Sequence, residues 1–420
     1  MIRSQPGLTR RELGAAAGAG LVASLAGPAH AAPARRPSPY LIGADISWLP
    51  QDEAAGATYF ENGVQRDPLL IFRDAGFNAI KLRLFVDPAN GYSKGRPPGP
   101  SGAPWCGIDQ TIDFARRIKA AGFHLSLTLH YSDTWADPEH QDKPAAWAAL
   151  SFPKLVEAVH RHTHDSLAAM KAAGAAPDMV VIGNETTFGM LWPDGRVPLS
   201  VPTGNPVTDR RHREVPGAGG YDRFADLLKA GLAAARETLP RAKLVLHNHL
   251  GRHWPIVRGW MDALIERGVR FDAAGFSCYQ QLAQGDWDRC FAEFGRRYPD
   301  HGFLVLEYSS RKRYVNDLVH AHPNGWGSFI WEPTRHQEAI FLRDGKNAGE
   351  GPRPDLIAQG LNTAEAPGST PPPTGEQPRR PSPGGRYDAD PAFLDLYRNM
   401  ARDYGLKAKS PAPTLIDRRP

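Results

Sequence analysis

Two glutamates that follow apolar runs are the residues whose type and setting point most directly to chemistry. Glu185 ends the run Val181-Ile182-Gly183-Asn184-Glu185, and Glu307 ends Leu304-Val305-Leu306-Glu307. A carboxyl group beside a buried strand is costly to ionise, so it is usually paired or functional. A salt bridge to a nearby arginine would explain either glutamate alone. Two such groups in one pocket could perform acid–base and nucleophilic chemistry.

A pair of carboxyl groups is what glycosidic bond cleavage with retention of configuration requires. One carboxylate attacks the anomeric carbon, while the other first protonates the leaving oxygen and then activates water. In this interpretation Glu185 is the acid/base and Glu307 is the nucleophile. The two carboxyl groups would lie about 5–5.5 Å apart, against about 6.5–9.5 Å in an inverting enzyme. The neighbouring Asn184 is suited to hydrogen-bond a sugar hydroxyl near the reacting carbon.

The elements that must position these residues are strands alternating with amphipathic helices. The predicted strands are 41–47, 79–86, 124–131, 179–184, 244–249, 273–279, 303–308 and 327–331. The predicted helices are 67–75, 109–121, 152–173, 221–238, 256–267, 286–298, 313–321 and a last one that begins at Asp390-Pro391. This alternation predicts a single (β/α)8 TIM barrel with long βα loops, whose active site lies at the carboxyl ends of the strands.

Other predicted strand ends are polar and aromatic. Arg83 could hold a carboxylate ionised, and His130 opens the long run that follows the third strand. Tryptophan faces suit sugar rings, because axial C–H groups pack on the ring while the hydroxyls stay free for hydrogen bonds. Of the ten tryptophans, Trp135, Trp192 and Trp331 lie close to strand ends. These positions predict a glycan-binding face.

The segments from Leu41 to Thr334 resemble glycoside hydrolase family 53, the arabinogalactan endo-β-1,4-galactanases. The matching segments are Gly43-Ala44-Asp45-Ile46-Ser47, Glu61-Asn62-Gly63, Leu82-Arg83-Leu84, Phe85-Val86-Asp87-Pro88, Lys119-Ala120-Ala121-Gly122, the run from His130 to Pro138, Pro177-Asp178-Met179, Gly183-Asn184-Glu185, Gly189-Met190-Leu191-Trp192-Pro193 and Trp331-Glu332-Pro333. The resemblance implies a (β/α)8 fold, retention of configuration and endo cleavage of β-1,4-galactan in pectin side chains. It supports Glu185 as acid/base and Glu307 as nucleophile, and it implies that Tyr279 hydrogen-bonds the nucleophile. The substrate-binding candidates are Asp45, Arg83, His130, Asp133, Trp135, Asn184, Trp192, His247, Tyr279 and Trp331.

Two strand ends depart from the family pattern. After the sixth strand the chain reads Ser277-Cys278-Tyr279-Gln280-Gln281, where family members usually carry Ser-Tyr-Tyr-Pro. Glu307 is followed by Tyr308-Ser309-Ser310 rather than by a small Thr-Ala or Thr-Ser pair. The calcium-holding loop of some bacterial members has no match either. We therefore expect preserved catalysis with a partly rebuilt sugar-binding rim.

Three alternative functions remain open at this point. The first is a retaining glycosidase of the same clan that acts on another β-linked glycan. The second is a non-catalytic glycan-binding protein, although such a protein has no reason to keep both Glu185 and Glu307. The third is a metal-dependent hydrolase using His130, Asp133, His247 and His249, since His-x-His is a usable ligand spacing. Further ligands follow no familiar spacing, so no metal and no cofactor is predicted.

The N-terminal residues are typical of an export signal. Residues 1–31 combine basic residues, a short apolar run and the cleavage-type ending Ala29-His30-Ala31. Thr9-Arg10-Arg11-Glu12-Leu13 resembles a twin-arginine motif. We expect the twin-arginine export machinery as a partner, and a secreted or periplasmic location. The apolar run of about fifteen residues is too short for a membrane span, which needs about twenty.

The rest of the chain is predicted to divide into a short Pro-rich linker at 32–39, the catalytic domain at 40–408 with a Pro-rich loop at about 349–390, and a tail at 409–420. Of the 420 residues, 41% are hydrophobic and 23% are charged, which is an ordinary balance for a globular protein. The net charge of +5 is spread along the chain and does not indicate nucleic-acid binding. The expected partner is therefore a polysaccharide or oligosaccharide.

Overall fold

The computed structural model of the chain describes residues 39–90, 105–204, 206–279, 286–309, 311–334, 339–343 and 384–406. All of them belong to one compact unit. The predicted export signal, most of the predicted linker, most of the Pro-rich loop and the C-terminal tail lie outside the described residues. Within the described residues, no helix combines the length and apolar character that crossing a membrane needs.

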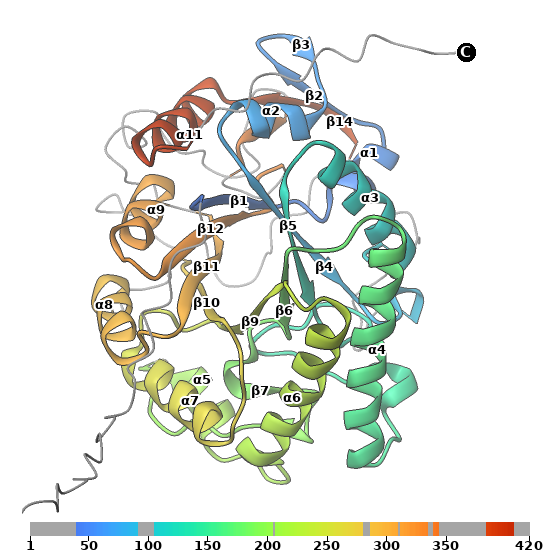
Figure 1. Cartoon of the computed structure of the whole chain (residues 1–420), viewed down its shortest axis with the longest axis vertical. Coiled ribbons are helices and arrows are strands. Elements are labelled where there is room, and N and C mark those ends of the chain that lie inside the picture. The colour runs from blue at the N-terminus through green and yellow to red at the C-terminus, as the bar shows by residue number, and fades with distance from the viewer. Residues whose placement is uncertain are drawn as a thin grey trace, which may run out of the picture. The chain divides into compact units, whose positions relative to one another are not determined.

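A closed barrel of eight parallel strands forms the centre of the fold (Figure 1). Its order is β1-β12-β11-β10-β9-β6-β5-β4, and pairing of β4 with β1 closes it. The strands are β1 Leu41–Asp45, β4 Ala79–Leu84, β5 His124–Leu129, β6 Met179–Ile182, β9 Lys243–Asn248, β10 Ala273–Ser277, β11 Gly302–Tyr308 and β12 Gly325–Trp331. The predicted (β/α)8 fold is confirmed. Several strands end earlier than predicted; β6 ends at Ile182, so Asn184 lies in the turn after the strand, with Glu185, rather than in the strand itself.

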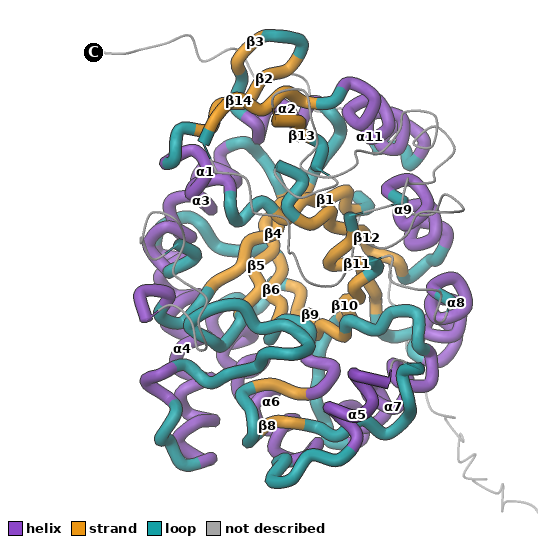
Figure 2. Tube along the Cα trace, turned by 180° about the vertical axis from the view of Figure 1, so that it is seen from behind, coloured by secondary structure: helices purple, strands orange, loops and turns teal. Residues whose placement is uncertain are grey.

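Helices surround this barrel and connect its strands (Figure 2). They are α1 Leu49–Ala54, α2 Pro68–Asp74, α3 Ile108–Ala120, α4 Phe152–Ala172, α5 Pro206–Arg213, α6 Gly220–Thr238, α7 Trp254–Glu266, α8 Trp287–Arg297, α9 Lys312–Ala321 and α11 Pro391–Asp403. Short 3₁₀ helices occur at Pro88–Asn90, Ala145–Trp147 and Thr186–Phe188. The eight predicted helices are present, while α1 and α5 are additional helices within long loops.

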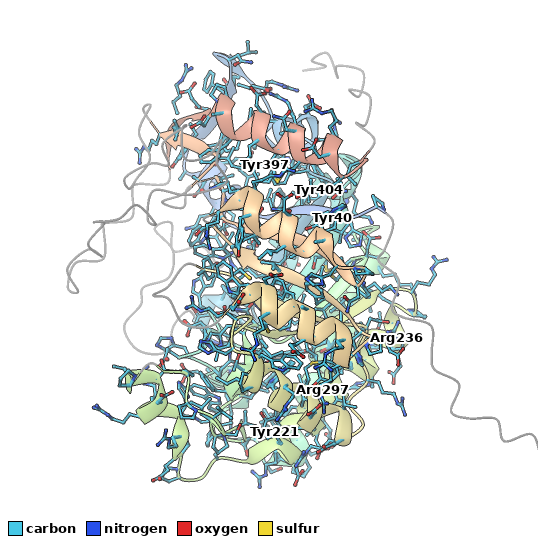
Figure 3. The ribbon with its side chains drawn as sticks, turned by 90° about the vertical axis from the view of Figure 1, so that its left-hand side faces the viewer. Tyr40, Tyr221, Arg236, Arg297, Tyr397 and Tyr404 are labelled. Atoms are coloured by element: carbon cyan, nitrogen blue, oxygen red, sulfur yellow. The ribbon has the colours of Figure 1, made fainter. Side chains whose placement is uncertain are left out.

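Helix α11 completes the ring, as the sequence predicted. The Asp390 side chain accepts a hydrogen bond from the Ala392 N–H and so caps its first turn. On its inner face the Tyr397 hydroxyl lies 2.8 Å from the hydroxyl of Tyr308 in β11. Near its end, Tyr404 packs edge to face against Tyr40, with 5.3 Å between the ring centroids (Figure 3). The chain's last described helix is thereby fixed to the barrel.

A second, four-stranded sheet was not predicted. Its order is β13-β14-β2-β3, with β2 at Ala57–Glu61, β3 at Val64–Gln65, β13 at Phe341–Arg343 and β14 at Gly385–Ala389. The strand β14 runs parallel to β2, although the two are far apart in sequence. A two-stranded sheet of β7 Gly189–Met190 and β8 Gly195–Arg196 shapes the loop after β6. These strands are too short to leave a clear periodic pattern.

The barrel interior is filled with apolar side chains. One buried cluster draws residues from every barrel strand except β5: Leu41, Ala79, Met179, Val181, Val245, Ala273, Leu304, Leu306, Trp326 and Phe329. Gly43 in β1 leaves room for the Phe329 ring, which a Cβ at this position would overlap. Because the interior is packed, polar chemistry is confined to the ends of the strands.

Candidate active site

Strand register brings the candidate residues together at the carboxyl ends of the barrel strands. Asp45 at the end of β1 is in register with Trp331 of β12 and with Lys81 of β4. Ser277 at the end of β10 is in register with Glu307 of β11. These side chains therefore converge from neighbouring strands on one region.

Glu307 is buried and held at both carboxyl oxygens. The Lys81 Nζ lies 3.2 Å from Oε1, and the Tyr279 hydroxyl donates to Oε2 at 3.0 Å. Burial, together with the charge of Glu307, raises the pKa of Tyr279 well above its usual value, so the phenol keeps the proton that it donates. Glu307 is thus an oriented carboxylate with a cation on one oxygen and a hydroxyl donor on the other.

Lys81 is a site residue that was not predicted from the sequence. Burial alone would lower the pKa of Lys81, but the charges of Glu307 and Asp45 and their hydrogen bonds raise it above its ordinary value. Its Nζ also lies 3.2 Å from Oδ2 of Asp45, whose Oδ1 accepts a hydrogen bond from the Ser47 hydroxyl at 2.9 Å. Alternate residues of a strand share a face, so the inward position of Arg83 was a signal for Lys81 as well.

Arg83 holds a carboxylate other than Glu307. Its Nη1 lies 2.6 Å from Oε1 of Glu332 and 3.6 Å from Oδ1 of Asp45. The guanidinium carbon lies 4.0 Å from the centroid of the Trp135 ring, a cation–π geometry. Glu332 directly follows Trp331, and no role was predicted for it from the sequence. Arg83 therefore anchors the end of β12 and one face of Trp135.

Glu185 has surroundings that favour its neutral form. It has a left-handed backbone, with φ of 48° and ψ of 46°, which turns the chain sharply after Gly183. Its Oε1 lies 2.5 Å from the neutral hydroxyl of Ser277. Burial first, and then the negative charge of Glu307, raise the pKa of Glu185 well above its usual range. A carboxyl with a raised pKa can donate a proton near neutral pH.

Asn184, His130 and His247 are fixed by protein groups. The Asn184 Nδ2 donates to the Ala136 carbonyl at 2.8 Å, and the Ala136 N–H donates to His130 Nδ1 at 3.0 Å. The His130 ring therefore carries its proton on Nε2 when neutral. His247 is fully buried, with Nδ1 3.2 Å from Asn184 Oδ1 and Nε2 3.0 Å from Ser277 Oγ. Both nitrogens of His247 are thus engaged within the protein.

Three tryptophans line one side of this region. The ring centroids of Trp48 and Trp331 are 5.2 Å apart, and those of Trp48 and Trp135 are 5.7 Å apart, both edge to face. Trp135 and Trp331 are half-buried, and Tyr279 lies edge to face with Trp331 at 6.5 Å. We call Trp48, Trp135 and Trp331 the aromatic wall. Trp48 was not among the predicted site residues.

Two predicted residues have other surroundings. Asp133 accepts hydrogen bonds from the backbone N–H groups of Asp87 at 3.0 Å and Ala145 at 2.8 Å, so it joins two loops. Trp192 belongs to the loop that contains β7 and β8. Its Nε1 donates to the Phe188 carbonyl at 3.0 Å, and the Arg196 guanidinium stacks on its ring at 4.0 Å. The partners of Asp133 and Trp192 are thus loop residues other than the two glutamates.

Across the described ranges, no group of three or more His, Cys, Asp or Glu residues is arranged to hold a metal ion. The four residues of the metal-hydrolase alternative have protein partners instead: His249 Nδ1, for example, lies 2.7 Å from the Thr187 hydroxyl. The three cysteines, Cys106, Cys278 and Cys290, are free and buried.

Comparison with known proteins identifies relatives. The family model described as glycosyl hydrolase family 53 matches residues 41–310. A probable arabinogalactan endo-β-1,4-galactanase A of Neosartorya fischeri is 26% identical, over 71% of this chain and 85% of that protein. An arabinogalactan endo-β-1,4-galactanase of Humicola insolens is 31% identical, over 56% of this chain and 63% of that protein. An uncharacterised protein of Niallia circulans is 36% identical, over 57% of this chain and 59% of that protein. The last two matches span less than two thirds of those relatives.

Solved structures agree with these relatives. The Ignisphaera aggregans GH53 catalytic domain matches with a TM-score of 0.64 and 28% identity, covering 89% of this chain and 98% of that domain. A structure of fungal β-1,4-galactanases matches with a TM-score of 0.60 and 24% identity, covering 73% of this chain and 96% of that one. The second match supports the barrel fold alone.

Proposed function

The chain belongs to glycosyl hydrolase family 53, and we propose that it cleaves β-1,4-galactan within the polymer, with retention of configuration. The observation that carries this proposal is the contrast between two buried carboxyl groups. Glu307 is held by Lys81 and Tyr279, whereas Glu185 contacts a neutral hydroxyl and has a raised pKa. A retaining glycosidase needs this pairing of an oriented nucleophile with a protonated acid.

In the first half of the proposed reaction, Glu307 attacks the anomeric carbon and forms a glycosyl ester. Glu185 gives its proton to the leaving glycosidic oxygen, so the departing sugar leaves as an alcohol. Lys81 and Tyr279 hold the two oxygens of Glu307, which fixes the direction of attack. The Tyr279 proton stays on the phenol because its pKa is raised by burial and by Glu307.

In the second half, Glu185 accepts a proton from water while that water attacks the anomeric carbon and releases Glu307. The negative charge of Glu307 is one cause of the raised pKa of Glu185. That charge disappears while Glu307 is esterified, so the pKa of Glu185 falls and its carboxylate becomes available as a base. The same residue thereby serves in both steps.

Sugar binding is assigned to the groups around the two glutamates. The aromatic wall offers ring faces for sugar C–H groups. The Asn184 amide uses one N–H on the Ala136 carbonyl, which leaves its second N–H for a sugar hydroxyl. His130, neutral because burial, Arg83 and Lys81 keep its pKa well below the usual value, can donate from Nε2. Galactan is proposed because it is the substrate named for the two galactanase relatives.

The test is hydrolysis of galactan, arabinogalactan, mannan, xylan and β-glucans, with products sized by chromatography and their anomeric configuration followed by NMR. We expect galactan to be cut to oligosaccharides with the β-configuration at the new reducing ends. Cleavage of a different β-linked glycan would replace the substrate assignment with the clan-level alternative. Binding of glycans without any hydrolysis would support the non-catalytic alternative, and initial formation of the α-anomer would contradict retention.

We also infer that residues 1–31 are a twin-arginine signal and that residues 40–408 form the catalytic domain of an exported protein. Replacing Arg10 and Arg11 by lysine should keep the precursor inside the cell, because the export machinery reads the arginine pair. Immunoblotting of cell fractions checks this. Normal export of the double-lysine precursor would contradict the twin-arginine assignment.

A further inference from the structure

A chain of buried hydrogen bonds connects Glu185 through Ser277 and His247 to Asn184. Glu185 Oε1 lies 2.5 Å from Ser277 Oγ, which lies 3.0 Å from His247 Nε2. His247 Nδ1 lies 3.2 Å from Asn184 Oδ1, and Asn184 Nδ2 lies 2.8 Å from the Ala136 carbonyl oxygen. We call Ser277, His247 and Asn184 the relay.

The far end of the relay fixes that direction. The Ala136 carbonyl oxygen only accepts, so the Asn184 group facing it is the NH₂, and Oδ1 faces His247. Asn184 Oδ1 also only accepts, so His247 Nδ1 must carry a hydrogen. Burial first, and then Lys81, His249 and His130, hold the pKa of His247 well below its usual value. A neutral ring with its hydrogen on Nδ1 has an acceptor at Nε2.

The near end of the relay follows from this. The Ser277 hydroxyl has one hydrogen, and His247 Nε2 is the acceptor that needs it. Ser277 Oγ then presents a lone pair to Glu185 Oε1 at 2.5 Å, and two lone pairs at that distance repel each other unless the carboxyl carries the hydrogen. Donation in the opposite sense, from Ser277 to an ionised Glu185, would lower the pKa of Glu185. We propose that His247, acting through Ser277, is a positioning residue that holds Glu185 in its protonated form. This rests on the proposed function, in which Glu185 is the acid.

When Glu185 is ionised, the single hydrogen of Ser277 cannot serve both the Glu185 carboxylate and His247 Nε2. Once its proton has gone to the leaving oxygen, Ser277 can donate to the carboxylate only by turning its hydroxyl away from His247. His247 Nε2 then loses its donor, and a buried acceptor without a partner is costly. When Glu185 takes a proton from water in the second step, the hydroxyl turns back. No net proton leaves or enters the relay.

Other titratable groups also act on Glu185 and His247. Glu307 and Asp137 raise the pKa of Glu185, while Lys81 lowers it. The groups that face the relay from the packed elements are Lys81 of β4, His130 and Asp137 after β5, His249 after β9, Tyr279 after β10 and Glu307 of β11. A test of the relay must therefore change the hydrogen bond without changing these charges.

The experiment follows the infrared band of the protonated carboxyl that disappears in the Glu185→Gln variant, titrated against pH. In His247→Phe, the Ser277 hydroxyl loses His247 as an acceptor, and Glu185 is its remaining hydrogen-bond partner among the described residues, so it can donate to the Glu185 carboxylate. We expect the acid dissociation constant of Glu185 to rise about tenfold, the worth of roughly one hydrogen bond. His247→Gln, which can donate to Asn184 and accept from Ser277, should restore the midpoint. The basic limb of kcat/KM for galactan should move in parallel.

Ser277→Ala supplies the matched control. Without the hydroxyl, His247 has no hydrogen-bonded path to Glu185, so adding His247→Phe to Ser277→Ala should leave the Glu185 midpoint where Ser277→Ala put it. A shift of equal size with and without Ser277 would overturn the relay. An unchanged midpoint in folded His247→Phe would overturn it as well.

A measurement on the wild-type protein covers the case in which His247→Phe does not fold. With ¹⁵N-labelled histidine, the ring nitrogen shifts of His247 should report a neutral ring with the hydrogen on Nδ1, and a hydrogen on Nε2 would overturn the relay. None of these spectroscopic readouts needs substrate turnover. A wild-type protein that shows the expected spectra but does not hydrolyse galactan would therefore overturn the proposed function and leave the relay standing.

Discussion

The ammonium group of Lys81 lies 3.2 Å from Oε1 of Glu307 and makes an equally long contact with Asp45. One buried cation thus serves two carboxylates, with Arg83 assigned to Glu332 beside them. A buried charge that loses its partner is strongly destabilising, because the remaining charge has neither water nor a counterion. The position of Glu307 therefore depends on Lys81.

Replacing Lys81 by methionine should destabilise the protein by about 3–5 kcal/mol, the range for breaking a buried ion pair. Galactan hydrolysis should fall at least tenfold, because Glu307 loses one of the two groups that orient it. Lys81→Arg keeps the charge and should retain more of both properties. Urea unfolding and initial rates measure the two effects. A methionine variant that unfolds at the wild-type urea concentration would show that Lys81 does not balance the two carboxylates.

The barrel could be predicted from the sequence because its signals are local. Apolar runs, helical periodicity and the Asp390-Pro391 start of α11 are each readable within a few residues. The four-stranded sheet could not be predicted, because β14 is defined by pairing with β2 at the other end of the domain. The residue pattern of neither strand indicates which strand it pairs with.

The candidate site also combines residues that could be predicted from the sequence with contacts that could not. Glu185 and Glu307 could be singled out because each follows an apolar run of residues, but their partners depend on how far side chains reach across the barrel. Lys81 and Arg83 share a strand face, and only the three-dimensional structure shows that Lys81 contacts Glu307. Ser277 matches the serine of the family pattern after the sixth strand, but a single serine at a strand end has many ordinary roles, so its contact with Glu185 could not be predicted.

Arg83 offers a second test of buried charge pairing. Arg83→Met removes the cation that lies 2.6 Å from the buried carboxylate of Glu332, and we expect a loss of about 3–5 kcal/mol of unfolding free energy. Arg117, which pairs with Glu53 and Asp67 at the surface and is 35% exposed, provides the control. Arg117→Met should cost about 1 kcal/mol or less. Similar losses in the two variants, measured in urea, would contradict the structural role of Arg83.

Substitution of the two glutamates should affect activated and natural substrates differently. Glu307→Ala should abolish turnover while leaving the fold and weak glycan binding intact, because no nucleophile remains. Glu185→Ala should lose about 10²–10⁴-fold on galactan, the usual contribution of a general acid. It should lose much less on a dinitrophenyl β-galactoside, whose leaving group needs no proton. Circular dichroism controls for folding. Unchanged galactan hydrolysis in Glu307→Ala would overturn the nucleophile assignment.

Azide, used as an external nucleophile, should also distinguish the Glu185 and Glu307 variants. An anion that enters the space left by the Glu185 side chain can attack the glycosyl ester without a general base. Glu185→Ala should therefore be accelerated by azide on the activated substrate and yield a β-galactosyl azide, identified by mass spectrometry and NMR. Glu307→Ala should yield either no azide product or the α-anomer. Rescue of the two variants with the same anomer would contradict their separate roles.

The raised pKa of Glu185 also predicts how the free energy of unfolding depends on pH. The folded protein binds the Glu185 proton more tightly than the unfolded chain does, because burial and Glu307 oppose ionisation. As pH rises above about 4.3, the ordinary pKa of a glutamate, the unfolded chain gives up this proton first. Between that value and the folded-state pKa the unfolded state binds fewer protons, so the free energy of unfolding decreases with rising pH.

Glu185→Gln removes that dependence while keeping the shape of the side chain and a hydrogen for Ser277. The variant should be inactive on galactan but more stable than the wild type at neutral pH. The gain should approach about 1.4 kcal/mol for each pH unit between the unfolded and folded pKa values, up to the pH of measurement. Below pH 4 the two proteins should unfold at similar urea concentrations. Equal stability at pH 7 would show that the folded protein does not oppose ionisation of Glu185, and it would remove the physical basis for its role as the acid.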